Sequence, residues 1–187
     1  TDAPTSHKFG GVLTDRSSNL KELLLALGAQ CRIKIDWPVD KLTAHFLKSS
    51  YVIQKTIDQD KVAEGSGGRT SLRIRHTDEK DLINVVSVHY GRDWSVSRST
   101  DAYKKVSRAT DSTSITKYGS KEQSDRFLYD FIHEDNSAMA DDLRDFWLAR
   151  LKDIARLISG DFKLDQYELL PGDVVGIGFL TRKSIPG

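Results

Sequence analysis

Seven apolar side chains recur at helical spacing in the C-terminal third of the chain, and no other feature of the sequence constrains the fold as strongly. Spacings of i, i+4, i+7, i+8, i+12, i+15 and i+19 place all seven on one stripe of a helix from about Ser137 to Ile158. They are Met139, Leu143, Phe146, Trp147, Leu151, Ile154 and Ile158. Such a stripe needs a covering surface, and we expect strands at 82–90 and 173–179 to supply it.

Alternating apolar and polar side chains predict strands elsewhere in the chain. Residues 30–47 fit a hairpin whose turn lies at 38–41. A short helix is expected before this hairpin. It would begin at Asn19, which is followed three places later by Glu22, and it would end at Gly28.

The middle of the chain is predicted to add a more deeply buried strand. Residues 82–90 carry apolar side chains on both faces, which is typical of a strand covered on both sides over part of its length. Residues 94–97 are expected to be its antiparallel neighbour. Residues 98–114 have little periodicity and are expected to form a loop or an irregular edge. Pro171-Gly172 fits a type II turn before a final strand.

These elements predict an α+β fold in which two helices pack on an antiparallel β system. A Gly-Ser joint at 64–68 suggests two modules. Residues 1–64 would hold the N-terminal helix and hairpin, and residues 69–187 a β-rich module with the long helix. Because the chain begins with Thr1 and its only methionine is Met139, we expect it to be a fragment of a larger protein.

The charges are balanced overall but unevenly distributed. The formal net charge is +1, so no bulk field attracts nucleic acid or an anionic membrane. Residues 69–126 nevertheless sum to +4 and residues 127–187 to −4. A basic middle beside an acidic end suits contacts between copies of the chain. A solvated mixture of charges without a partner is the alternative interpretation.

The composition offers few means of catalysis or cofactor binding. The single cysteine, Cys31, can form no internal disulfide and no cysteine cluster for zinc, and its place on an apolar strand face favours inert packing. No serine lies in a Gly-x-Ser-x-Gly motif, and the Gly-rich segment at 65–69 lacks the end of a phosphate loop. No segment approaches the roughly 18 apolar residues of a membrane span. We expect no enzyme activity, catalytic residue, cofactor, metal, small-molecule substrate or membrane span.

One basic segment could make contacts with another macromolecule. Its cations interleave with Trp94 and Tyr103, as in proteins that bind single-stranded nucleic acid. They are Arg92, Arg98, Lys104, Lys105 and Arg108. Asp93 and Asp101 lie in the same stretch, so a subunit contact or a solvated edge is the preferred interpretation. His133-Glu134-Asp135 contains metal-competent groups, but adjacent residues converge poorly on one ion, and a structural role is preferred.

Four segments, in their order along the chain, resemble minor structural proteins of tailed-bacteriophage tails. The segments are Asn84–Tyr90, Asp111–Gly119, Ala140–Leu151 and Leu170–Val175. In that family of baseplate or tail-tip hub proteins, a strand ending in Tyr-Gly, a helix and a Pro-Gly-Asp-Val-Val strand recur in this order. Here Ser120 separates Tyr-Gly from the charged pair that often follows it in the family.

The resemblance implies a phage or prophage virion protein that works through its surfaces. It implies small β-barrel-like or sandwich modules with packed helices, assembled as a homotrimer ring around the tail axis. Such a ring joins the tail tube to baseplate or tip proteins, after assembly in the host bacterial cytoplasm. Two alternatives stay open: a tail-tip peptidoglycan-degrading domain that uses Glu134 and Asp135, and a nucleic-acid-binding module that uses residues 92–108.

Overall fold

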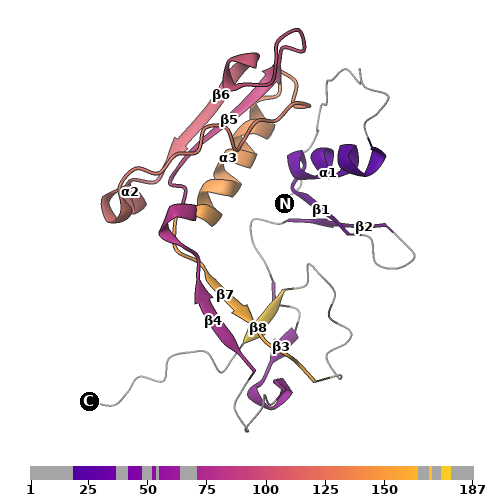
Figure 1. Ribbon diagram of the computed structural model, residues 1–187, viewed down its shortest axis with the longest axis vertical. Helices are drawn as coiled ribbons and strands as arrows, with labels where there is room; N and C mark the ends of the chain where they lie inside the picture. The colour runs from indigo at the N-terminus through magenta and orange to yellow at the C-terminus, as the bar shows by residue number, and fades with distance from the viewer. Residues whose placement is uncertain are drawn as a thin grey trace. The chain divides into compact units, whose positions relative to one another are not determined.

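The computed structural model describes residues 19–36, 42–47, 52–53, 55–63, 71–163, 169 and 174–177. Within these residues the chain forms three α-helices and eight strands, and the strands pair into four two-stranded sheets (Figure 1). The predicted α+β class is confirmed, and the described strands form no closed barrel. The chain divides into two compact units, one of residues 1–49 and 77–155 and the other of residues 50–76 and 156–187.

Both units are assembled from separated stretches of sequence. We expected contiguous modules at 1–64 and 69–187, whereas one unit combines residues 1–49 with 77–155 and the other residues 50–76 with 156–187. The Gly-Ser joint at 64–68 lies outside the described residues, as do the turns expected at 38–41 and 171–172.

The first unit is built around β5 (Val85–Arg92), which pairs antiparallel with β6 (Tyr103–Thr110). Every residue from Val85 to Gly91 is buried, so the prediction of a strand covered on both sides is confirmed. Helix α3 (Ser137–Leu151) packs against both strands (Figure 1). The core residues are Ile83, Val86, Val88, Tyr90, Phe127, Tyr129, Ile132, Met139, Ala140 and Leu143.

The partner of β5 differs from the expected one. Residues 94–97 lie in a turn, and the neighbour is β6, within the segment expected to be a loop or irregular edge. This strand gives little periodic signal because Lys104, Lys105, Val106 and Arg108 are all exposed. Its position is instead fixed by backbone pairing with the strongly apolar β5.

Helix α3 is shorter than its apolar stripe predicts. It ends at Leu151, and Ile158, the last residue of the stripe, lies in β7 (Arg156–Ser159). At the helix end the carbonyl of Leu151 accepts the N–H of Ile83 at 2.9 Å, and the carbonyl of Lys152 accepts the hydroxyl of Ser114. These tertiary donors satisfy carbonyl groups that a longer helix would have used.

The N-terminal helix and hairpin are confirmed, with one correction. Helix α1 (Leu20–Gln30) begins where Asn19 accepts the N–H of Lys21, and β1 (Ile33–Asp36) pairs antiparallel with β2 (Thr43–Phe46). Gly28 does not end the helix. A Cβ at this buried position would lie 2.8 Å from the carbonyl oxygen of Ile33, so Gly28 permits close packing of α1 on β1.

The segment expected as a strand ending in Tyr-Gly is helical. Helix α2 (Ser112–Tyr118) begins at Asp111, whose Oδ1 accepts the N–H of Ser114 at 2.8 Å. Gly119 ends the helix with a φ of +75°, a backbone conformation that glycine adopts without steric cost. The Asx start and glycine stop therefore specify a short helix here.

The second unit holds two small sheets. β3 (Lys55–Ile57) pairs parallel with β8 (Val175–Ile177), and β4 (Arg73–His76) pairs antiparallel with β7. Val62 and Phe162 form an isolated antiparallel bridge. β8 is the described part of the 173–179 strand that was expected to cover α3, and its partner is β3 of this second unit.

Candidate functional site

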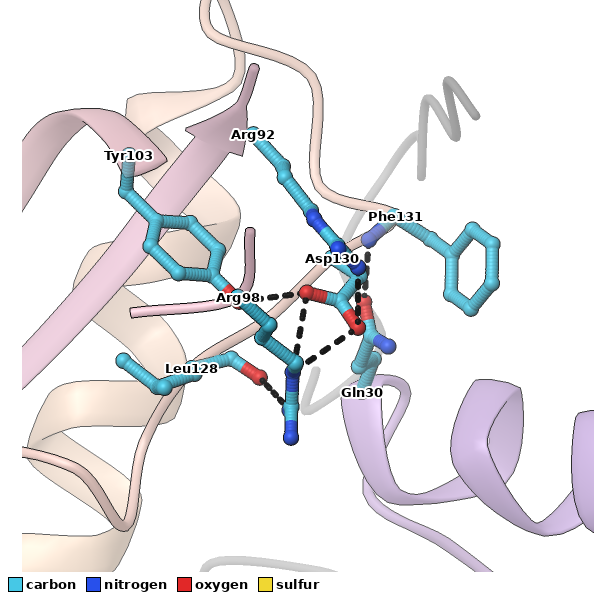
Figure 2. A network of polar contacts seen from close by, with 7 residues as sticks. All are labelled: Gln30, Arg92, Arg98, Tyr103, Leu128, Asp130 and Phe131. Carbon is cyan, nitrogen blue, oxygen red and sulfur yellow. Dashed lines mark hydrogen bonds and ion pairs between the residues drawn. The ribbon is translucent and has the colours of Figure 1, made fainter. Parts of the chain in front are cut away.

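Three side chains converge on the carboxylate of Asp130, in the turn-rich segment before α3 (Figure 2). Arg92 Nη1 lies 3.2 Å from Oδ2, and Arg98 Nε lies 3.3 Å from the same oxygen. The hydroxyl of Tyr103 donates to Oδ1. We call Arg92, Arg98, Tyr103 and Asp130 the Asp130 centre.

The fold brings these residues together from separate elements. Arg92 ends β5 and faces Tyr103, the first residue of β6, in the strand register. Arg98 lies in the loop between them and also donates to the carbonyl of Leu128 at 3.1 Å. Next to Asp130, the N–H of Phe131 donates to Oε1 of Gln30 at 2.8 Å, which ties α1 to the same segment (Figure 2).

The electrostatics of the Asp130 centre suit a structural support. Burial, together with the hydrogen bond to Asp130, raises the pKa of Tyr103 to about 12, so the phenol stays protonated and can donate. The guanidinium of Arg92 stacks on Trp94 at 4.3 Å, and its Nε is buried without a hydrogen-bond partner. The ring of Trp94 also contacts that of Phe131. The aromatic groups proposed for base stacking are therefore engaged within the chain.

Four of the five cations proposed for a subunit contact form ion pairs inside the chain. Besides the pairs of Arg92 and Arg98 with Asp130, Lys104 Nζ lies 2.9 Å from Glu134, and Arg108 Nη2 lies 3.0 Å from Glu122. Lys105 is exposed, and no acidic group of the described residues forms an ion pair with it. The basic segment is thus largely neutralised by carboxylates that follow it in sequence.

The His133-Glu134-Asp135 segment does not converge on one point. The ion pair with Lys104 lowers the pKa of Glu134, and His133 Nδ1 lies 3.4 Å from the exposed carboxylate of Asp135. Among the described residues no group of three or more His, Cys, Asp or Glu side chains could hold a metal ion. Cys31 packs half-buried against the core, and burial raises the pKa of its thiol.

A second polar centre was not predicted from the sequence. Asn84 is fully buried, and its Nδ2 donates to the carbonyl of Gly119 at 2.7 Å and to Ser114 Oγ at 3.2 Å. Its Oδ1 accepts the N–H of Lys121 at 2.8 Å. An asparagine at the start of an apolar strand was the only available signal, and its partners lie 30 to 37 residues away.

This Asn84 centre also reaches the end of α3. The hydroxyl of Ser114 donates to the carbonyl of Lys152, and Lys152 Nζ pairs with Asp111 Oδ2 at 2.8 Å. The pair lowers the pKa of Asp111 and raises that of Lys152. Asn84, Asp111, Ser114 and Lys152 thereby join the start of β5, helix α2 and the end of α3. Two of the four segments that carry the phage-tail resemblance meet here, together with Lys152, which directly follows a third.

Comparisons with known proteins add no family assignment. No protein-family model matches the chain, and no curated protein matches it significantly. In the part of the chain that the structure describes, none of the helices combines the length and apolar character needed to cross a membrane.

Proposed function

We propose that the chain is a structural component of a phage or prophage tail hub, which joins the tail tube to baseplate or tip proteins. The observation that carries the proposal is the Asn84 centre. It gives a physical reason for the order of the resembling segments, because a buried asparagine at the start of β5 needs the donor and acceptors supplied by α2 and the residues after it.

Carboxylates of the first unit form ion pairs that hold its elements in place, which supports a structural protein that acts through its surfaces. Asp130, Glu122 and Glu134 each hold a cation from the β5–β6 region, so these carboxylates position elements of the first unit. The peptidoglycan-degrading alternative would need Glu134 as a general acid. A general acid works best with a pKa near the operating pH, whereas Lys104 lowers the pKa of Glu134.

The proposed contact between copies is centred on β6. This strand pairs with β5 on one side, and Lys105 and Val106, which is 51% exposed, are exposed on its two opposite faces. Residues 127–187 carry a net charge of −4, and their exposed carboxylates include those of Asp145 and Asp153. A heterologous contact between basic and acidic surfaces can close into a ring, and by analogy with tail hubs we propose a homotrimer located in the virion tail.

The test is the oligomeric state of the full-length protein, measured by light scattering. Lys105→Glu is the most informative change because Arg98→Glu or Lys104→Glu would also break ion pairs with Asp130 or Glu134. We expect a trimer whose dissociation constant rises about tenfold with Lys105→Glu. At high salt the same substitution should raise the dissociation constant by a smaller factor. Lys117→Glu, an exposed change on α2, is the matched control and should leave assembly unchanged.

Two results would count against this function. A full-length protein that stays monomeric at all concentrations, or a trimer that Lys105→Glu weakens no more than Lys117→Glu does, would remove the proposed contact. Lysis of peptidoglycan by the wild-type protein and its loss with Glu134→Gln would support the enzymatic alternative instead.

A further inference from the structure

The sheet formed by β4 and β7 in the second unit is unusually exposed to solvent. All eight residues of the two strands are exposed, including Ile74 (49%), Leu157 (56%) and Ile158 (39%). Among the described residues, no other strand pairs with the outer edge of β4 or β7. A two-stranded sheet is marginally stable in water, and a third strand or a packed layer normally completes it.

The charge of this sheet is also uncompensated. β4 carries Arg73 and Arg75, and β7 carries Arg156, and none of these three guanidinium groups forms an ion pair with a described residue. The cations of the 92–108 segment behave differently, because four of the five are paired. Unpaired arginines therefore gather on the β4–β7 sheet.

The strand register separates the side chains into two faces. Arg73 and Arg75 alternate with Ile74 and His76, so the two arginines share one face of the sheet. On the other face Ile74 lies directly opposite Ile158. A strand added beside β4 would place alternate side chains next to the arginines and next to Ile74.

We propose that the outer edge of β4 binds an extended, acidic segment of a partner protein, which adds to the sheet as a third strand. The segment would alternate acidic and apolar residues. Its carboxylates would lie beside Arg73 and Arg75, and its apolar side chains would pack beside Ile74, on the face that also carries Ile158. Backbone hydrogen bonds to the open edge would supply the pairing, and the charges would select the partner.

The same features argue against two other occupants. Pairing of β4 with β4 of a second copy would bring arginines together, and like charges on neighbouring strands are destabilising. Single-stranded nucleic acid is bound largely by stacking on aromatic side chains, and β4 and β7 carry no Phe, Tyr or Trp. This surface belongs to the second unit, and its test does not depend on the tail-hub assignment.

A labelled ten-residue peptide of alternating Glu and Val serves as the probe, with binding to the full chain followed by fluorescence anisotropy. We expect saturable binding that Arg73→Glu/Arg75→Glu weakens at least about tenfold. Lys117→Glu/Arg126→Glu changes the net charge equally at two exposed positions of the first unit and should have little effect. Hydrogen exchange with bound peptide should slow at the amides of residues 73–76.

Three control ligands make the test decisive. A peptide with five Glu followed by five Val has the same composition, and N-methylation at alternate residues of the original peptide blocks one edge of its backbone. Both should bind at least about tenfold more weakly than the alternating peptide. Equal binding of either one, equal loss in both charge-reversed variants, or tighter binding of a ten-nucleotide oligothymidylate would overturn the proposal.

Discussion

Arg32 shows how one residue can hold several elements of the first unit together. It is 3% exposed, and its guanidinium lies 3.3 Å from Asp142 of α3 and within 5 Å of the ring centres of Phe46 and Phe146. Its φ of +57° is the only positive value at a non-glycine residue in the described part of the chain. A buried guanidinium with one carboxylate and two aromatic faces compensates for a backbone conformation that side chains disfavour.

The backbone and side-chain contributions of Arg32 can be separated with two substitutions. Arg32→Ala and Arg32→Gly both remove the guanidinium, but only alanine retains the steric cost of a positive φ. We expect both variants to be less stable than the wild type, and Arg32→Gly to be more stable than Arg32→Ala by about 1 kcal/mol. Urea denaturation measures the difference, and equal stabilities would show that the backbone at residue 32 relaxes.

His89 should make the stability of the first unit depend on pH. The side chain is 9% exposed, its Nδ1 has no hydrogen-bond partner, and burial lowers its pKa despite the nearby charges of Glu122 and Asp101. The unfolded chain, with a pKa of about 6.5, therefore binds the proton more readily than the folded chain. Stability should fall as the pH drops below about 6.5 towards the folded pKa.

The control for this pH dependence is His89→Phe, which keeps a ring that can contact Tyr103 but cannot be protonated. The free energy of unfolding at pH 7.5 and at pH 5.5 should differ less in this variant than in the wild type. A difference of the same size in both proteins would assign the pH dependence to the carboxylates.

At the scale of elements, the sequence predicted what periodicity encodes and missed what tertiary contacts decide. The apolar stripe from Met139 to Leu151 predicted α3, and apolar residues on both faces predicted β5. The end of α3 could not be predicted, because the donors at its last carbonyls come from Ile83 and Ser114. β6 was missed because its outward face is charged.

Tertiary contacts also decide which residues of the candidate sites are paired. The sequence singled out Arg92, Arg98, Lys104, Lys105 and Arg108. The carboxylate partners of four of them, all except Lys105, lie 14 to 38 residues further along the chain. Which charges are paired depends on how the β5–β6 sheet meets the segment before α3. A periodic pattern carries no information on that arrangement. Of the five cations, only Lys105 is exposed and forms no ion pair with a described residue, as was expected of the whole group.

The packing of α3 against the core of the first unit can be tested at Trp147. Its indole N–H donates to Tyr129 at 2.8 Å, and its ring contacts Phe127 and Phe146. We expect Trp147→Ala to lower the free energy of unfolding by about 3 kcal/mol through lost burial. Trp147→Phe should cost less, about 1 kcal/mol, because it mainly removes the hydrogen bond. An unchanged denaturation midpoint with Trp147→Ala would contradict this packing.

At the scale of the whole molecule, the two units differ in how their strands are protected. The first unit encloses β5 between α3, β6 and the segment before the helix, and its polar groups are tied together at the Asn84 and Asp130 centres. In the second unit β4 and β7 expose every residue. Buried apolar contacts and protected backbone hydrogen bonds give a segment its local stability. The first unit is therefore expected to be the more stable one.

Hydrogen exchange under native conditions should resolve this difference. Amides of β5 should exchange only through near-global unfolding, whereas amides of β4 and β7 should open with a free energy lower by a few kcal/mol. Trp147→Ala supplies the control, because it should accelerate exchange in β5 and leave β4 and β7 almost unchanged if the units open independently. Equal protection of the two sheets in the wild type would mean that the β4–β7 sheet unfolds only with the core. In that case the sheet would need no third strand for its stability, and the energetic reason for an acidic partner strand would be lost.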